Sequence, residues 1–67
     1  MSNKIATPQD IYSTEGHMLK IEFHDEAGDH IIDVVWDFSD EQTSENRIKL
    51  REFAYRWMQQ QGWHIET

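Results

Sequence analysis

Two short segments with alternating apolar and polar residues place the strongest constraint on the fold. The odd-numbered residues of Leu19–Phe23 are apolar, and so are the even-numbered residues of Ile32–Phe38. A period of two is typical of strands that bury one face. Between the segments, residues 25–29 read DEAGD, a polar stretch whose single glycine indicates a turn. The two segments therefore predict a β-hairpin whose apolar side chains share one face.

The parity of the residue numbers also predicts the register of this hairpin. For both apolar sets to share a face, an odd residue of the first strand must pair with an even residue of the second. A loop from Asp25 to Gly28 meets this condition, with Gly28 free to adopt a positive φ. This register places His24 on the outer face and His30 on the inner one. The predicted pairs are His24 with Asp29, Ile21 with Ile32, Leu19 with Val34, and Lys20 with Asp33.

A change of period after residue 38 predicts a helix. Ser39 and Gln42 are three residues apart and fit a capping box at its start. Gly62 fits the position that follows a helix end, and residues 63–65 read as a short final strand. On a helical wheel, one apolar stripe contains Leu50, Phe53, Ala54, Trp57 and Met58.

These elements predict an α+β fold. We expect a small antiparallel sheet of three to four strands in ββαβ order, with one long helix packed on one face. Residues 17–67 form this mini-domain. Residues 1–16 are expected to be a partly ordered N-terminal segment, in which Ile11–Ser13 is a candidate edge strand.

The core of such a domain must rely on packing. The chain has 67 residues and no cysteine, so no disulfide supports it. Three Trp and three Phe side chains are a large aromatic content for this length, and aromatic side chains bury much surface each. We expect Trp36, Phe53 and Trp57 to meet between sheet and helix.

Charge is the feature that most restricts the partner. The chain has 13 acidic and 6 basic residues, a formal net charge of −7. This balance disfavours direct contact with nucleic-acid phosphates or an anionic membrane and favours a basic partner. The acidic residues are concentrated between Ile21 and Asn46, where no Lys or Arg occurs: Glu22, Asp25, Glu26, Asp29, Asp33, Asp37, Asp40, Glu41 and Glu45.

Two of these carboxylates lie inside the most apolar stretch of the chain. In a strand, Asp33 and Asp37 point the same way but lie about 13 Å apart. That distance is too long to chelate one metal ion or to form a glycosidase pair. They are either a solvated outer face that protects the sheet, or part of a mixed acidic and apolar binding face with Ile31 and Val35.

No motif indicates catalysis or a cofactor. The HDEAGDH stretch of residues 24–30 contains metal-ligand types, but the predicted register separates its two histidines and EF-hand spacing is absent. There is no recognisable nucleophile motif and no glycine-rich phosphate loop. We therefore expect no enzyme activity, no metal and no cofactor.

Two apolar residues of the helix lie off its main stripe. Ile48 and Tyr55 share one side of the wheel, where they either pack against the N-terminal segment or form a second candidate docking patch. The basic residues of the helix straddle it instead of forming one stripe along a phosphate backbone, which argues against nucleic-acid binding: Arg47, Lys49, Arg51 and Arg56.

These features favour a small acidic, non-enzymatic protein-binding module in the cytoplasm. We expect it to occupy a basic surface of a larger protein, such as a nucleic-acid-processing enzyme, by phosphate mimicry. The alternative is a structural or homodimeric subunit that associates through the open sheet face or edge. In size, acidity and lack of catalytic motifs the chain is similar to small phage-encoded inhibitors of host enzymes. The expected binding residues are Glu22, Asp25, Glu26, Asp29, Ile31, Asp33, Val35, Asp37, Asp40 and Glu41.

Overall fold

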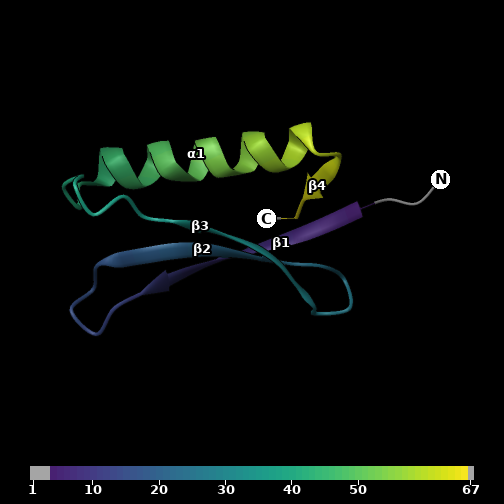
Figure 1. Cartoon of the computed structure of the whole chain (residues 1–67), viewed down its shortest axis with the longest axis horizontal. Coiled ribbons are helices and arrows are strands. Elements are labelled where there is room, and N and C mark those ends of the chain that lie inside the picture. The colour runs from purple at the N-terminus through teal and green to yellow at the C-terminus, as the bar shows by residue number, and fades with distance from the viewer. Residues whose placement is uncertain (1–3, 67) are drawn as a thin grey trace.

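The computed structural model describes residues 4–66, and it confirms the α+β fold. The four strands form one sheet in the order β3-β2-β1-β4, and α1 lies across one face of it (Figure 1). β1, β2 and β3 are antiparallel as expected, but β4 pairs parallel to β1, so that the sheet is mixed. The elements are β1 (Lys4–Tyr12), β2 (Met18–His24), β3 (His30–Val35), α1 (Ser44–Gln60) and β4 (Trp63–Ile65).

The strand in the N-terminal segment lies inside the sheet, not at its edge. β1 separates β2 from β4, and it is longer than the candidate strand at residues 11–13. Its pattern was hidden because its inward positions are Ala6, Pro8 and Asp10 in place of large apolar residues. β4 pairs only with Lys4–Ala6, so β1 has no neighbouring strand on that side at Pro8. Proline lacks a backbone N–H, and at this free edge no N–H is needed for a bond to another strand. Residues 1–3 of this segment lie outside the described residues.

The hairpin forms with the predicted faces but a different register. Ile21 pairs with Val34 and Phe23 with Ile32, two residues away from the predicted alignment. The loop spans residues 25–29, and a bulge follows Phe23. Gly28 adopts a φ of +86°, as expected. Since the shift is an even number of residues, the apolar side chains of both strands still share the inner face.

The helix begins at Ser44, five residues after the predicted cap. Thr43 is the N-cap, and its Oγ1 accepts the N–H of Asn46 at 3.1 Å. Ser39 and Gln42 were assigned to this role wrongly, because each bonds elsewhere, Ser39 to Asp37 and Gln42 to the backbone of β2. The helix ends as expected, with a positive φ at the glycine that follows its cap.

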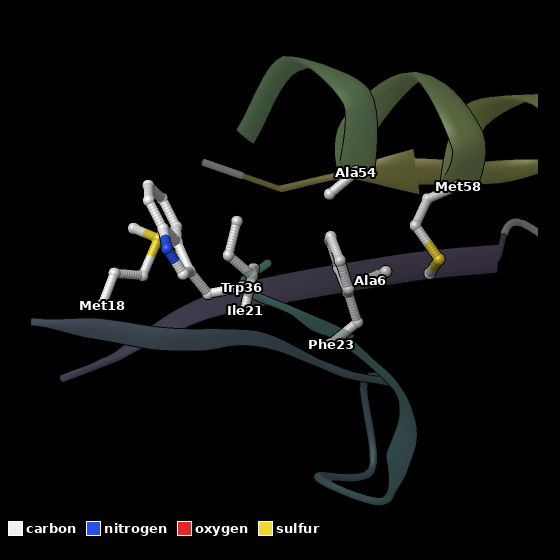
Figure 2. Packing of buried hydrophobic residues seen from close by; sticks show 7 residues of the cluster. All are labelled: Ala6, Met18, Ile21, Phe23, Trp36, Ala54 and Met58. Atoms are coloured by element: carbon white, nitrogen blue, oxygen red, sulfur yellow. The ribbon is translucent and has the colours of Figure 1, made fainter. Parts of the chain in front are cut away.

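The core lies between the sheet and α1 (Figure 2). The prediction is confirmed for Trp36, which is only 4% exposed. It is wrong for Phe53 and Trp57, which are 60% and 37% exposed. The buried side chains that fill the space instead are Ala6, Met18, Ile21, Phe23, Ala54 and Met58.

Two contacts explain why the helix is rotated relative to the predicted stripe. Nη2 of Arg51 lies 2.6 Å from Oδ2 of Asp10 on the inner face of β1. The ring of Tyr55 meets Phe23 of β2 edge-on, with 6.1 Å between centroids. Because this flank of α1 faces β1 and β2, the opposite flank, with both exposed aromatic residues, turns towards solvent.

Phe23 lies in the core and Phe53 on the solvent-facing flank of α1, so a comparison of the two provides a direct stability test. Phe23→Ala should lower the free energy of unfolding by about 3–5 kcal/mol, because it opens a cavity in the core. Phe53→Ala removes the same atoms from the surface and should change it by less than about 1 kcal/mol. Urea titration followed by circular dichroism measures both values. Equal losses in the two variants would contradict the observed rotation of α1.

Candidate binding surface

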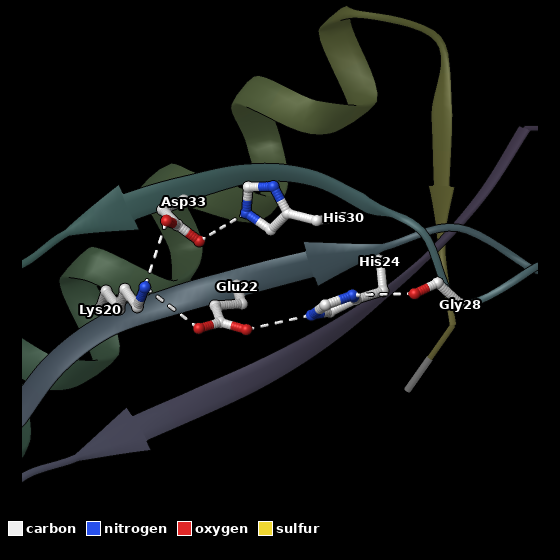
Figure 3. Close-up of polar contacts among 6 residues, drawn as sticks. All are labelled: Lys20, Glu22, His24, Gly28, His30 and Asp33. Atoms are coloured by element: carbon white, nitrogen blue, oxygen red, sulfur yellow. Dashed lines mark hydrogen bonds and ion pairs between the residues drawn. The ribbon is translucent and has the colours of Figure 1, made fainter.

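The middle of the outer sheet face is polar, and its charges are partly paired with one another (Figure 3). Nζ of Lys20 lies 3.1 Å from Glu22 and 3.2 Å from Asp33. The other oxygens of these carboxylates bond histidine rings: Nε2 of His24 is 3.1 Å from Glu22, and Nε2 of His30 is 2.8 Å from Asp33. Glu22 and Asp33, two of the predicted binding residues, are therefore already engaged within the sheet.

His30 lies on the outer face, and the prediction that placed it on the inner face was wrong. The bulge after Phe23 shifts the register at this end, so that His24 pairs with His30. Their rings meet edge-on with 5.6 Å between centroids. Within residues 4–66, no group of three or more His, Cys, Asp or Glu side chains is placed to hold a metal ion.

The contacts of this network shift the pKa values of its members in the directions expected of ion pairs. The hydrogen bond from His24 lowers the pKa of Glu22, with a further contribution from Lys20. The hydrogen bond from His30 lowers the pKa of Asp33, and Lys20 adds to this effect. Glu22 in turn raises the pKa of His24. Each shift favours the charged, paired form of its group.

Two other predicted binding residues shape turns. Oδ1 of Asp25 accepts the N–H groups of Ala27 and Asp29, at 3.0 and 2.9 Å. Oδ1 of Asp37 accepts the N–H and the hydroxyl of Ser39, at 3.0 and 2.8 Å. The backbone bond from Ser39 also lowers the pKa of Asp37. These carboxylates stabilise the loops, as Asx turns do.

The remaining predicted acids lie at the two ends of the sheet. Glu26 and Asp29 are exposed in the β2–β3 turn, which we call the hairpin end. Asp40 and Glu41 are exposed in the segment between β3 and α1, which we call the loop end. The six residues of β3 separate the two ends by about 20 Å. The structure therefore divides the predicted acidic surface into two.

The predicted apolar residues of this surface differ in exposure. Val35 is exposed at the end of β3 that leads into the loop end, whereas Ile31 is half-buried and packs against the core cluster. The second candidate patch is also divided. Ile48 is exposed, but Tyr55 is half-buried against Phe23 and borders residues 7–10 of β1. Tyr55 thus packs against β2 and lines a hollow together with residues 7–10 of the N-terminal segment.

The loop end contains a pocket that the sequence did not reveal. Its volume is about 410 Å³, and its walls come from the β1–β2 turn, the start of β2 and residues 36–42. The side-chain amide of Gln42 bonds both the N–H and the C=O of Met18, at 3.0 and 2.9 Å, and so fastens the loop to the sheet. Nε1 of Trp36 donates to the carbonyl of Asp40 at 3.4 Å.

Phe38 is the largest apolar group exposed at this pocket. It is 77% exposed, although the alternation of residues 32–38 predicted it on the inner face. β3 ends at Val35, so the strand period does not extend to residue 38. The polar neighbours of Phe38 gave no signal, because Phe23 lies between Glu22 and His24 and is fully buried.

A further exposed surface lies on α1. Phe53, Arg56, Trp57 and Gln60 line a shallow hollow of about 200 Å³, which we call the aromatic flank. Lys49 borders it and pairs with Glu45 at 3.3 Å, as the helical spacing predicts.

Comparison of the chain with protein families, with curated proteins and with solved structures found no match. Within residues 4–66, no helix has the length and apolar character needed to cross a membrane. Function must therefore be inferred from the chemistry of these surfaces.

The histidine network makes a testable prediction about pH. Glu22→Gln should lower the pKa of His24, because the Glu22 carboxylate raises it in the folded protein. A raised folded-state pKa adds stability below the unfolded-state value, and this stability is lost as pH rises through the folded-state pKa. We expect NMR titration of the His24 ring to show the lower pKa in the variant. Between the unfolded-state and folded-state pKa values of His24, the free energy of unfolding should also fall less with rising pH in the variant than in the wild type.

The control for this measurement is Glu52→Gln, which makes the same chemical change on the exposed face of α1. It should leave the His24 titration unchanged. An identical His24 pKa in the wild type and Glu22→Gln would show that the ring and carboxylate do not interact in solution.

Proposed function

We propose that this chain is a small acidic, non-enzymatic module that binds a basic, nucleic-acid-binding surface of a larger protein in the cytoplasm. Support comes chiefly from one observation: at the loop end, Phe38 is exposed beside the free carboxylates of Asp40 and Glu41. An aromatic anchor with charged surroundings is typical of protein-binding surfaces.

The loop end is a better contact site than the middle of the outer face. Glu22 and Asp33 already have cationic or histidine partners, so their fields are partly cancelled. The side chains of Asp40 and Glu41 form no hydrogen bond or ion pair within residues 4–66. Their charge is therefore available to steer a basic partner.

This chemistry favours inhibition by phosphate mimicry. Sites that grip nucleic acid carry Lys and Arg side chains that neutralise phosphates. Carboxylates presented on an exposed loop offer the same charge to such a site, and Phe38 adds an apolar contact. The bound module would then exclude nucleic acid from the enzyme.

Charge reversal at each acidic end tests this proposal with matched variants. Asp40→Lys with Glu41→Lys should weaken binding to the purified partner at least tenfold, or about 1.4 kcal/mol. Glu26→Lys with Asp29→Lys makes the same change in net charge at the hairpin end and should have a much smaller effect. Binding is measured by isothermal titration calorimetry at low salt, with circular dichroism as the check on folding.

Competition separates phosphate mimicry from other modes of binding. Duplex DNA should displace the wild-type module from the same partner. Simultaneous binding of DNA and module would contradict mimicry, and equal affinity of the loop-end variant and wild type would contradict the proposed surface.

The second candidate is a homo-oligomer, and the aromatic flank favours it. Arg56 belongs to this flank and Glu52 precedes it with i,i+4 spacing, yet no ion pair joins the two within residues 4–66. In an antiparallel two-fold pairing of α1 with a second copy, equivalent flanks meet, and Glu52 of one copy lies opposite Arg56 of the other. Phe53 and Trp57 would then be buried between the two helices.

Light scattering over a range of concentrations tests this alternative. A dimer formed in this way should dissociate in Arg56→Glu and re-form in the exchanged variant Glu52→Arg with Arg56→Glu, because the exchange restores opposite charges. A wild-type protein that stays monomeric throughout would rule the homo-oligomer out.

A further inference from the structure

We propose that the pocket at the loop end receives one arginine side chain of the basic partner. This inference deepens the proposed function, on which it rests, by naming the group that the surface recognises. The pocket combines an apolar floor, an exposed aromatic ring and two carboxylates at its rim, and each part matches one part of an arginine side chain.

The floor suits the aliphatic stem of the ligand. Half-buried Leu19 supplies accessible apolar surface at the base of the pocket, and Met18 and Trp36, which are 0% and 4% exposed, pack behind it. Long basic side chains pack their methylene groups along such surfaces and keep the charged end in water. The volume of about 410 Å³ is within the usual range for small-ligand sites.

The polar atoms that remain free at the rim select a cation. The hydroxyl of Ser13 already accepts the N–H groups of Glu15 and His17, and the Gln42 amide is engaged with β2. Among the neutral polar side chains of the pocket, Ser13 and Gln42 are thus engaged by the fold, whereas the Thr14 hydroxyl and the His17 ring also line it. The carboxylates of Glu15 and Asp40 remain, apart from a 3.9 Å contact between Glu15 and Nδ1 of His17.

The arrangement favours a guanidinium over an ammonium group. A guanidinium is planar, can stack on an aromatic ring such as Phe38, and can donate to a carboxylate through two N–H groups at once. A lysine ammonium is a more strongly hydrated point charge and gains less from such a ring. An anionic ligand such as a phosphate is repelled by Glu15 and Asp40.

An NMR titration with a small probe tests the pocket without the partner. N-acetyl-arginine amide should shift the amide signals of residues 13–19 and 36–42 and the indole signal of Trp36. N-acetyl-norleucine amide, which has the apolar stem alone, should produce little shift. N-acetyl-lysine amide should bind more weakly than the arginine probe.

Two matched variants identify the groups responsible. Asp40→Asn should weaken the arginine probe about tenfold, since a charge-assisted bond becomes a neutral one. Asp29→Asn makes the same change at the hairpin end and should leave the affinity unchanged. Phe38→Ala should remove the preference for arginine over lysine, because it removes the ring on which the guanidinium stacks.

The pocket inference is overturned if the arginine and norleucine probes give the same shifts, if arginine and lysine bind the wild type equally, or if Asp40→Asn has no effect. These outcomes are independent of the charge-reversal test. A partner that still depends on Asp40 and Glu41 while the arginine probe does not bind would retain the proposed function and reject the pocket.

Discussion

The contacts between α1 and the inner face of the sheet orient the helix, and they include an ion pair between Asp10 and Arg51. Asp10 presents a carboxylate on the inner face of β1, where most strands carry apolar groups, and Arg51 reaches it from α1 at 2.6 Å. The pair raises the pKa of Arg51. Because both side chains are partly exposed, its net contribution to stability is modest. Together with the edge-on contact of Tyr55 with Phe23, the pair lies on the side of α1 that faces the sheet.

The distribution of apolar residues follows from this orientation. Ala54 and Met58 enter the core, and the small side chain of Ala54 allows close approach of helix and sheet. Phe53 and Trp57 remain on the outer flank. A domain of this size has few large apolar residues, so two exposed aromatic side chains are a substantial loss to its core. Large apolar side chains that stay exposed in this way commonly mark a surface that contacts another molecule.

The same fold brings the parts of the loop end together. β1 and β2 are joined by the turn at residues 13–17, and the chain leaving β3 passes beside this turn before α1 begins. Gln42 replaces a neighbouring strand by bonding both backbone groups of Met18. The pocket is therefore built on a fastened loop. This rigidity lowers the entropy lost when a partner binds.

Alternating apolar residues and glycine positions predicted the elements that are specified by neighbouring residues in the chain. The hairpin, the helix end at Gly62 and the strand at residues 63–65 were all predicted. β1 was predicted only in part, as a candidate edge strand at residues 11–13, because Pro8 and Asp10 replace apolar residues at its inward positions. The rotation of α1 was not predicted, since it depends on contacts between residues far apart in the chain, such as Asp10 and Arg51, which are 41 positions apart.

The candidate binding site was likewise predictable only in part from the sequence. The acidic residues themselves could be named, but their division into paired, turn-forming and free groups depends on contacts across the sheet. The contact between Lys20 and Asp33 was predicted, although from a different register, whereas the bonds from Gln42 to Met18, 24 residues away, were not. Periodicity in a single segment carries no information on such pairs. The exposed Phe38 was misassigned for a related reason, because the end of β3 could not be located.

The most direct test of this account is hydrogen exchange of the module in complex with its purified partner. Partner binding at the loop end predicts that new amide protection is confined to residues 13–19 and 36–42. The outer strands near the hairpin end and the exposed flank of α1 should exchange as in the free module. Protection concentrated at residues 24–30 or 53–60, with none at the loop end, would contradict it.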